Sequence, residues 1–125
     1  MIFYNLFLYL LFPIAILRLF SKKEFNVAQI KRIKERLGLK KHLNCEDPIW
    51  IHAVSVGEVK VAVLLVKELK KIFSDSNFLI TTSTVTGSNE VTKSFGSEVA
   101  HQYLPYDLNG VIKKFLINLN PKCLI

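Results

Sequence analysis

The residue best suited to chemistry in this chain is a carboxylate that directly follows a predicted strand. Glu58 comes after the apolar, strand-forming residues 48–55, and Gly57 stands just before it. In parallel α/β sheets, ligands bind where the chain leaves the carboxyl end of a strand. Glycine at position 57 allows a sharp turn or a close approach of a ligand. A carboxylate placed there can act as a general base that takes a proton from an attacking hydroxyl.

The same residues also have a purely structural interpretation. Ser55-Val56-Gly57-Glu58 fits the S-x-x-E capping box, in which Ser55 caps a helix and Glu58 reaches back to the Ser55 amide. A glutamate in a first helical turn is also stabilised by the helix dipole. The spacing alone favours this interpretation and leaves the catalytic one open.

A second polar cluster follows the next predicted strand and supplies hydroxyls and backbone amides at a helix start. Such a setting suits an anion or a sugar, although simple helix capping explains it equally well. The cluster contains neither the P-loop nor the dinucleotide-binding glycine pattern. Together with the first turn after residue 54, it gives these candidate substrate-binding residues: Ser55, Gly57, Thr84, Thr86, Gly87 and Ser88.

The order of predicted elements defines the fold class. Apolar strands alternate with amphipathic helices, which is typical of a parallel sheet with right-handed crossovers. The class is therefore α/β with a Rossmann-like parallel sheet. Strands are expected at 49–54, 78–82, 99–104 and 121–125, and helices at 58–73, 89–95 and 108–119, the last capped by Asp107.

The positive charge is confined to one segment. The chain has a net charge of +7, and residues 18–41 account for all of it, so residues 42–125 are neutral. This basic segment directly follows an apolar N-terminus, which indicates a membrane surface as partner rather than nucleic acid.

Residues 1–20 are predicted to be a hydrophobic membrane-anchor helix. At the helical rise per residue, 20 residues reach roughly 30 Å, the thickness of the hydrocarbon core. Pro13 leaves an interfacial helix that does not span as the main alternative. The basic residues that follow keep the rest of the chain in the cytoplasm. Residues 21–47 are expected to form a basic amphipathic helix over 27–39, ended by Gly38, and a linker. The apolar stripe of this helix is expected to pack on the domain, and its basic side chains to meet either anionic lipid or solvent.

Metal and redox chemistry find no support in the cysteine and histidine spacing. Cys45 and Cys123 form no C-x-x-C pair and no metal-binding spacing with the three histidines. His101 and Tyr103 alternate onto one face of a predicted strand, where a single histidine is more often structural than catalytic. We expect no metal, no cofactor and two free thiols.

Three motifs together resemble one family. They are Trp-Ile-His-Ala-Val-Ser-Val-Gly-Glu at 50–58, Thr-Thr-Ser-Thr-Val-Thr-Gly at 81–87 and His-Gln-Tyr-Leu-Pro-Tyr-Asp-Leu at 101–108. In this order and spacing they look like the N-terminal half of the 3-deoxy-D-manno-octulosonic acid (Kdo) transferases. The apolar N-terminus and the segment Glu35-Arg36-Leu37-Gly38 are similar to that family as well.

The resemblance implies a GT-B glycosyltransferase with two Rossmann-like domains, of which residues 48–125 would be a truncated, acceptor-side part. Such an enzyme is inverting and moves Kdo from CMP-Kdo to a lipid A precursor at the cytoplasmic face of the bacterial inner membrane. In the family motif, Glu58 takes the position of the general base. Without a donor-binding half, the 125 residues alone are expected to be inactive.

Two other functions fit the same sequence. One is a membrane-tethered half-domain that binds a lipid or a protein partner and does no chemistry. The other is a GT-B transferase that uses a different nucleotide sugar.

Overall fold

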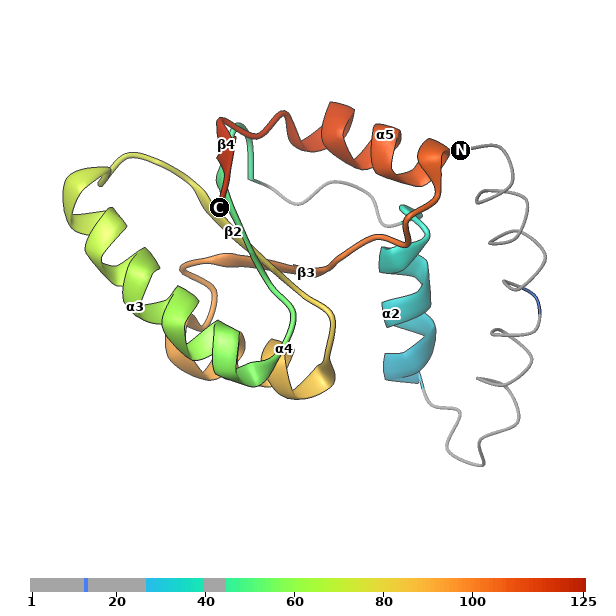
Figure 1. Cartoon of the computed structure of the whole chain (residues 1–125), viewed down its shortest axis with the longest axis horizontal. Coiled ribbons are helices and arrows are strands. Elements are labelled where there is room, and N and C mark those ends of the chain that lie inside the picture. The colour runs from blue at the N-terminus through green and yellow to red at the C-terminus, as the bar shows by residue number, and fades with distance from the viewer. Residues whose placement is uncertain (1–12, 14–26, 40–44) are drawn as a thin grey trace.

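A parallel sheet of four strands lies at the centre of the described part of the chain. The computed structural model describes residues 13, 27–39 and 45–125. The strand order is β3-β2-β1-β4, with every neighbouring pair parallel, as the alternation of strands and helices predicts (Figure 1). The strands are β1 (Ile49–Ala53), β2 (Phe78–Thr82), β3 (Ala100–Tyr103) and β4 (Cys123–Leu124).

The helices that connect the strands cover both faces of the sheet. On one face, side chains of α3 and α4 pack against β1 and β2; on the other, α5 packs against Trp50 and Leu79. A further helix, α2, precedes the sheet in the chain and lies at the carboxyl end of β3 (Figure 1). The bounds are α2 (Val27–Arg36), α3 (Val56–Ile72), α4 (Val85–Phe95) and α5 (Asn109–Leu119).

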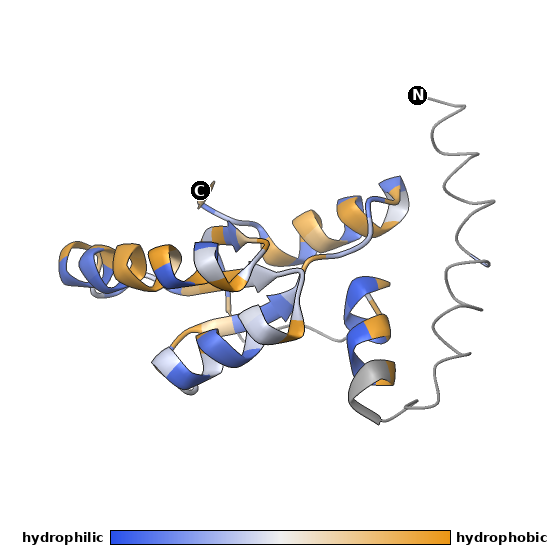
Figure 2. Cartoon of the chain, turned by 60° about the horizontal axis from the view of Figure 1, so that its bottom comes forward, coloured by the Kyte–Doolittle hydropathy of each residue, from blue (hydrophilic) through white to orange (hydrophobic). Residues whose placement is uncertain are grey.

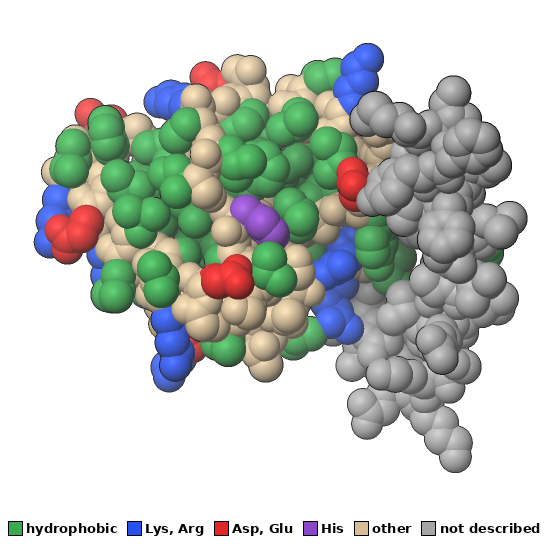
Figure 3. Space-filling view, viewed as in Figure 1, with side chains coloured by type: hydrophobic (Ala, Val, Ile, Leu, Met, Phe, Trp, Pro, Cys, Tyr) green, Lys and Arg blue, Asp and Glu red, His purple; other side chains and the backbone are tan. Residues whose placement is uncertain are grey.

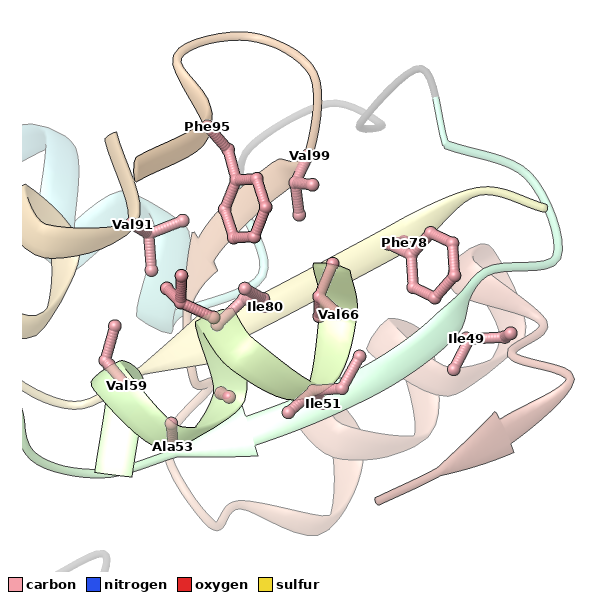
Figure 4. Close-up of a cluster of buried hydrophobic side chains, with 12 residues drawn as sticks. Ile49, Ile51, Ala53, Val59, Val66, Phe78, Ile80, Val91, Phe95 and Val99 are labelled. Atoms are coloured by element: carbon pink, nitrogen blue, oxygen red, sulfur yellow. The ribbon is translucent and has the colours of Figure 1, made fainter. Parts of the chain in front are cut away.

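The main core lies between the sheet and the helices α3 and α4 (Figure 4). Alternate residues of β1 point into it, so Ile49, Ile51 and Ala53 are buried there while Trp50 packs on the opposite face. All five residues of β2 are buried, as expected for a central strand of a parallel sheet. This packing fixes the register that brings the strand ends together at one edge, here called the carboxyl edge.

Three predicted helix starts differ from the observed ones. Helix α3 begins at Val56 and α4 at Val85, earlier than expected, because Ser55 and Thr84 occupy the N-cap positions. The prediction that Asp107 caps the last helix is wrong. Helix α5 has Leu108 at its N-cap and no side-chain cap, because the leucine side chain carries no hydrogen-bond acceptor.

The basic amphipathic helix is present and shorter than predicted. Helix α2 ends at Arg36, and Gly38 follows with a φ of +66°, a left-handed conformation that favours glycine. Blue and orange residues alternate around this helix and around α3 (Figure 2). The predicted anchor, residues 1–20, lies outside the described residues apart from Pro13. Within the described ranges, no helix combines the length and hydropathy needed to cross a bilayer.

Candidate active site

The first turn of α3 forms the capping box that the sequence predicts, with one difference. Ser55 has extended backbone angles, and its Oγ accepts a hydrogen bond from the Glu58 amide at 3.4 Å. The glutamate side chain was predicted to reach the Ser55 amide. Instead, Glu58 Oε2 accepts from the amide of Val54 at 2.6 Å. The carboxylate is therefore held one residue further back, over the end of β1.

Glu58 is fixed in position and still open to solvent. Its second carboxylate oxygen, Oε1, accepts a hydrogen bond from Ser55 Oγ at 3.4 Å, and the side chain is exposed. A short bond from a backbone amide limits the rotamers of the glutamate. The structure thus presents an oriented carboxylate at the carboxyl edge, where α/β proteins bind ligands.

The hydroxyl cluster after β2 forms the first turn of α4. Thr84 Oγ1 accepts from the amide of Gly87 at 3.1 Å and from the hydroxyl of Thr86 at 3.3 Å. The Ser88 amide donates to the Thr84 carbonyl at 3.0 Å, as in an ordinary helix. Most of these polar groups therefore serve the helix start, as the capping interpretation predicts.

The two candidate turns meet at one residue, Val54. The Val54 carbonyl accepts from the Ser83 amide at 3.4 Å and from Thr84 Oγ1 at 3.5 Å, while its amide donates to Glu58. The structure therefore brings the carboxylate and the start of α4 together at the ends of β1 and β2.

The two candidate glycines lie in different surroundings. Gly87 is buried, and a β-carbon there would lie 3.3 Å from Val59 Cγ2 and 3.4 Å from Thr82 Cβ. Its missing side chain lets α4 pack closely against α3 and β2. Gly57 is exposed, and a β-carbon there would meet only Ser55 Oγ, at 3.8 Å. Neither packing nor a positive φ requires glycine at position 57.

His101 has a structural environment. Its Nε2 lies 2.9 Å from the hydroxyl of the buried Thr82, and its ring meets Tyr103 edge-on at 5.4 Å between centroids. The last contact confirms that His101 and Tyr103 share one face of β3. A satisfied histidine of this kind fits the structural role that the sequence favours.

The carboxyl edge also contains residues that motif analysis did not assign to the site. The end of α2 docks there: Arg36 Nη2 donates to the Ser83 carbonyl at 2.5 Å, and the Tyr106 amide donates to the Arg36 carbonyl at 2.9 Å. Glu35 is buried and accepts from the Tyr103 amide at 3.3 Å. Helical periodicity does not single out Glu35 or Arg36. Only the tertiary arrangement places them at the edge, where the last turn of α2 packs through these two charged residues.

The chemistry available at the edge is that of acids, bases and hydrogen bonds. It holds the exposed carboxylate of Glu58, the buried carboxylate of Glu35, two helix N-termini, and the guanidinium groups of Arg32 and Arg36, which both lie over the Tyr103 ring. In the part of the chain that the structure describes, no three His, Cys, Asp or Glu residues lie close enough together to hold a metal ion. The fold and the edge define an α/β protein with a parallel sheet whose candidate site centres on Glu58.

Comparison with known proteins places the chain in a family. Residues 31–125 match the family model described as 3-deoxy-D-manno-octulosonic-acid transferase (kdotransferase). The chain therefore belongs to the Kdo transferase family and contains its N-terminal region.

Individual relatives agree with the family model. The chain is 41% identical to the 3-deoxy-D-manno-octulosonic acid transferase of Haemophilus influenzae over 97 residues, which is 76% of this chain and 23% of the relative. It is 35% identical to the enzyme of the same name from Rickettsia bellii over 114 residues, 90% of this chain and 27% of the relative. The chain thus spans about a quarter of the length of these curated relatives. No solved structure matches the chain.

Proposed function

We propose that this chain is the acceptor-side part of an inverting, GT-B glycosyltransferase that transfers Kdo from CMP-Kdo to a lipid A precursor. Its family membership supports Kdo transfer as the reaction class. The donor, the acceptor and the stereochemistry are parts of the proposal. The parallel sheet with ligand-accessible strand ends is the kind of half-domain that a two-domain transferase requires.

The observation that carries the proposal is the position of Glu58. Its carboxylate is exposed, held by the Val54 amide and placed at the carboxyl edge. In the proposed reaction, Glu58 takes the proton of an acceptor hydroxyl while that oxygen bonds to the anomeric carbon of Kdo. The bond from this carbon to the phosphate oxygen of CMP breaks, and CMP leaves with the electron pair. Attack opposite the leaving group inverts the anomeric centre.

The remaining candidate residues have different roles in this proposal. Gly57 leaves open space beside the base for a substrate, since the packing of the chain itself does not require glycine at this position. Thr86 and Ser88, in the first turn of α4, offer polar groups to a sugar hydroxyl. Ser55, Thr84 and Gly87 hold the two helix starts in place.

The location is also part of the proposal. Residues 1–20 would attach the protein to the bacterial inner membrane, and the basic segment that follows would keep the site on the cytoplasmic side. The basic residues of α2 would then lie near the membrane surface that contains the anionic lipid acceptor.

The test is Glu58→Gln in the product of the complete gene. Glutamine still accepts a hydrogen bond from the Val54 amide but cannot take a proton. Loss of a general base lowers kcat by about 10²–10⁴-fold, whereas a capping role is served by glutamine as well as by glutamate. Kdo transfer and the melting temperature are measured together.

The matched control is Glu68→Gln, which makes the same change at an exposed position on α3 that is paired with Lys71. It is expected to leave kcat unchanged. The 125-residue chain alone provides a second reference and is expected to transfer no Kdo, because it aligns with only about a quarter of each relative. A Glu58→Gln protein with normal melting and near-normal kcat would refute the catalytic assignment.

A further inference from the structure

The guanidinium of Arg36 is held rigidly at the carboxyl edge. One N–H of its Nη2 donates to the Ser83 carbonyl at 2.5 Å. Its central carbon lies 5.6 Å from the ring centroid of Tyr103 and 5.3 Å from that of Tyr106. The Arg36 carbonyl also accepts the Tyr106 amide at 2.9 Å. Side chain and backbone are thus both fixed, so little rotamer freedom remains to be lost when a ligand binds.

Among the residues that the structure describes, no carboxylate forms a salt bridge with Arg36. Both salt bridges found among the described residues involve lysines of α3, and neither includes Arg36. The hydrogen bond to Ser83 uses one of the five N–H donors of the guanidinium. The rings of Tyr103 and Tyr106 attract the positive charge of Arg36. They do not replace the in-plane hydrogen bonds that the two oxygens of a phosphate or carboxylate make with a guanidinium. A partly buried cation with free donors is prepared for an anionic ligand.

Arg36 and Glu58 lie on the two sides of one hydrogen-bonded bridge. Glu58 accepts from the Val54 amide, the Val54 carbonyl accepts from the Ser83 amide, and the Ser83 carbonyl accepts from Arg36. Two residues, Val54 and Ser83, therefore connect the cation to the candidate base. In the space-filling view, exposed apolar side chains cover much of the face drawn there (Figure 3).

We infer that Arg36 binds an oxyanion of the substrate, a phosphate or a carboxylate, and so positions the sugar beside Glu58. This inference rests on the proposed function, since both substrates of that reaction carry such groups. The planar fork of arginine fits two oxygens of a phosphate or carboxylate at once, which the single ammonium of lysine does not do. Arg36 would therefore be a binding residue and Glu58 the base.

The experiment is an NMR titration of the 125-residue chain that follows the guanidinium signals of Arg36. Three probes separate the possible sources of the oxyanion: glucosamine 1-phosphate carries a phosphate, Kdo carries a carboxylate, and glucosamine carries neither. We expect one or both anionic sugars to shift the Arg36 signals, and glucosamine not to shift them. The probe with the lower Kd identifies the group that the site prefers.

Two variants test the specificity of the site. Arg36→Lys keeps the charge and loses the fork, so the Kd of the preferred anionic sugar is expected to rise by about tenfold or more, as the loss of a charge-assisted hydrogen bond implies. Lys34→Gln removes a charge from the exposed side of the same helix turn and is expected to leave Kd within about twofold, because screened surface charges contribute little. The melting temperature of each variant identifies effects on folding.

The inference fails if neither anionic sugar shifts the Arg36 signals of the wild-type chain. It also fails if a folded Arg36→Lys chain binds as tightly as wild type, or if Lys34→Gln weakens binding equally. If the Arg36→Lys chain does not fold, the titration of the wild-type chain with the three sugars still shows whether an anionic sugar binds at Arg36. Binding at Arg36 together with normal Kdo transfer by Glu58→Gln would refute the proposed catalytic role and leave the anion site intact.

Discussion

The indole of Trp50 donates a hydrogen bond to the hydroxyl of Thr81 across neighbouring strands, with 2.8 Å between Nε1 and Oγ1. Thr81 is fully buried, and the same hydroxyl lies 3.0 Å from Nδ1 of His52. The Trp50 N–H can only donate, so it occupies one lone pair of the hydroxyl. The single hydrogen of Thr81 is free of the indole and can be donated to His52 Nδ1, an arrangement that requires the proton of the neutral imidazole to be on Nε2.

The first prediction is that neutral His52 carries its proton on Nε2. Its ¹⁵N chemical shifts, measured above the imidazole pKa, should show a protonated Nε2 and an unprotonated Nδ1. Thr81→Val should remove this preference and destabilise the fold by about 1–3 kcal/mol, because it leaves the buried indole N–H without an acceptor.

The control for this prediction is Thr92→Val, the same substitution at an exposed position of α4 where the hydroxyl donates to the Ser88 carbonyl. It should change the free energy of unfolding by less than about 0.5 kcal/mol. A His52 with its proton on Nδ1, or two equally stable valine variants, would contradict the chain of hydrogen bonds from Trp50 to His52.

The second prediction concerns the two glycines in the first turns of α3 and α4. Gly87→Ala should destabilise the fold by about 1–3 kcal/mol, because the new β-carbon would lie 3.0 Å from Thr84 Oγ1 and 3.3 Å from Val59 Cγ2. Gly57→Ala should be neutral or stabilising, since its β-carbon has space and alanine is the better helix former. Denaturant unfolding of both variants gives the comparison.

The same pair separates folding from function. In the product of the complete gene, Gly57→Ala should lower Kdo transfer without lowering the melting temperature, because the added methyl group would stand beside Glu58. Unchanged transfer would show that the open space at Gly57 is not used by a substrate.

The third prediction is that the two cysteines differ in reactivity. Cys45 is buried, with its Sγ 3.8 Å from the Phe78 carbonyl, and burial raises the pKa of its thiol. Cys123 is exposed. Since the thiolate is the reactive form, iodoacetamide should modify Cys123 in the native chain and reach Cys45 only on unfolding. Mass spectrometry of peptides from alkylated native protein decides, and equal labelling of both would contradict the burial of Cys45.

The fourth prediction concerns the membrane. The full chain should stay with the membrane fraction through washes with high salt and with alkaline carbonate, because residues 1–20 are apolar enough to embed in a bilayer. A chain without residues 1–20 should be released by salt, which screens the attraction between its basic residues and anionic lipids. If both chains are released equally by carbonate, the anchor interpretation is wrong.

Local patterns in the sequence were sufficient for the order of the elements and for the two turns. Strand-forming runs at 49–54 and 78–82 predict β1 and β2 because a central parallel strand is buried on both faces. Ser55 and Glu58, three positions apart, predict a helix start here. In the structure the helix begins earlier than expected, at Val56, and Glu58 reaches the Val54 amide instead of the Ser55 amide. Such features depend on residues that are near one another in the chain, so the sequence determines them directly.

The tertiary structure decided what surrounds the candidate base. Arg36 and Ser83 are 47 positions apart, and Glu35 and Tyr103 are 68 apart. Contacts over such distances arise only when the sheet has assembled and α2 has docked on its edge, so no spacing or periodicity in the sequence encodes them. The need for glycine at position 87 likewise depends on the separation of α3 and α4. The sequence by itself determined which residue is the candidate base, and only the packing of distant segments decided that a guanidinium lies at the same edge of the sheet.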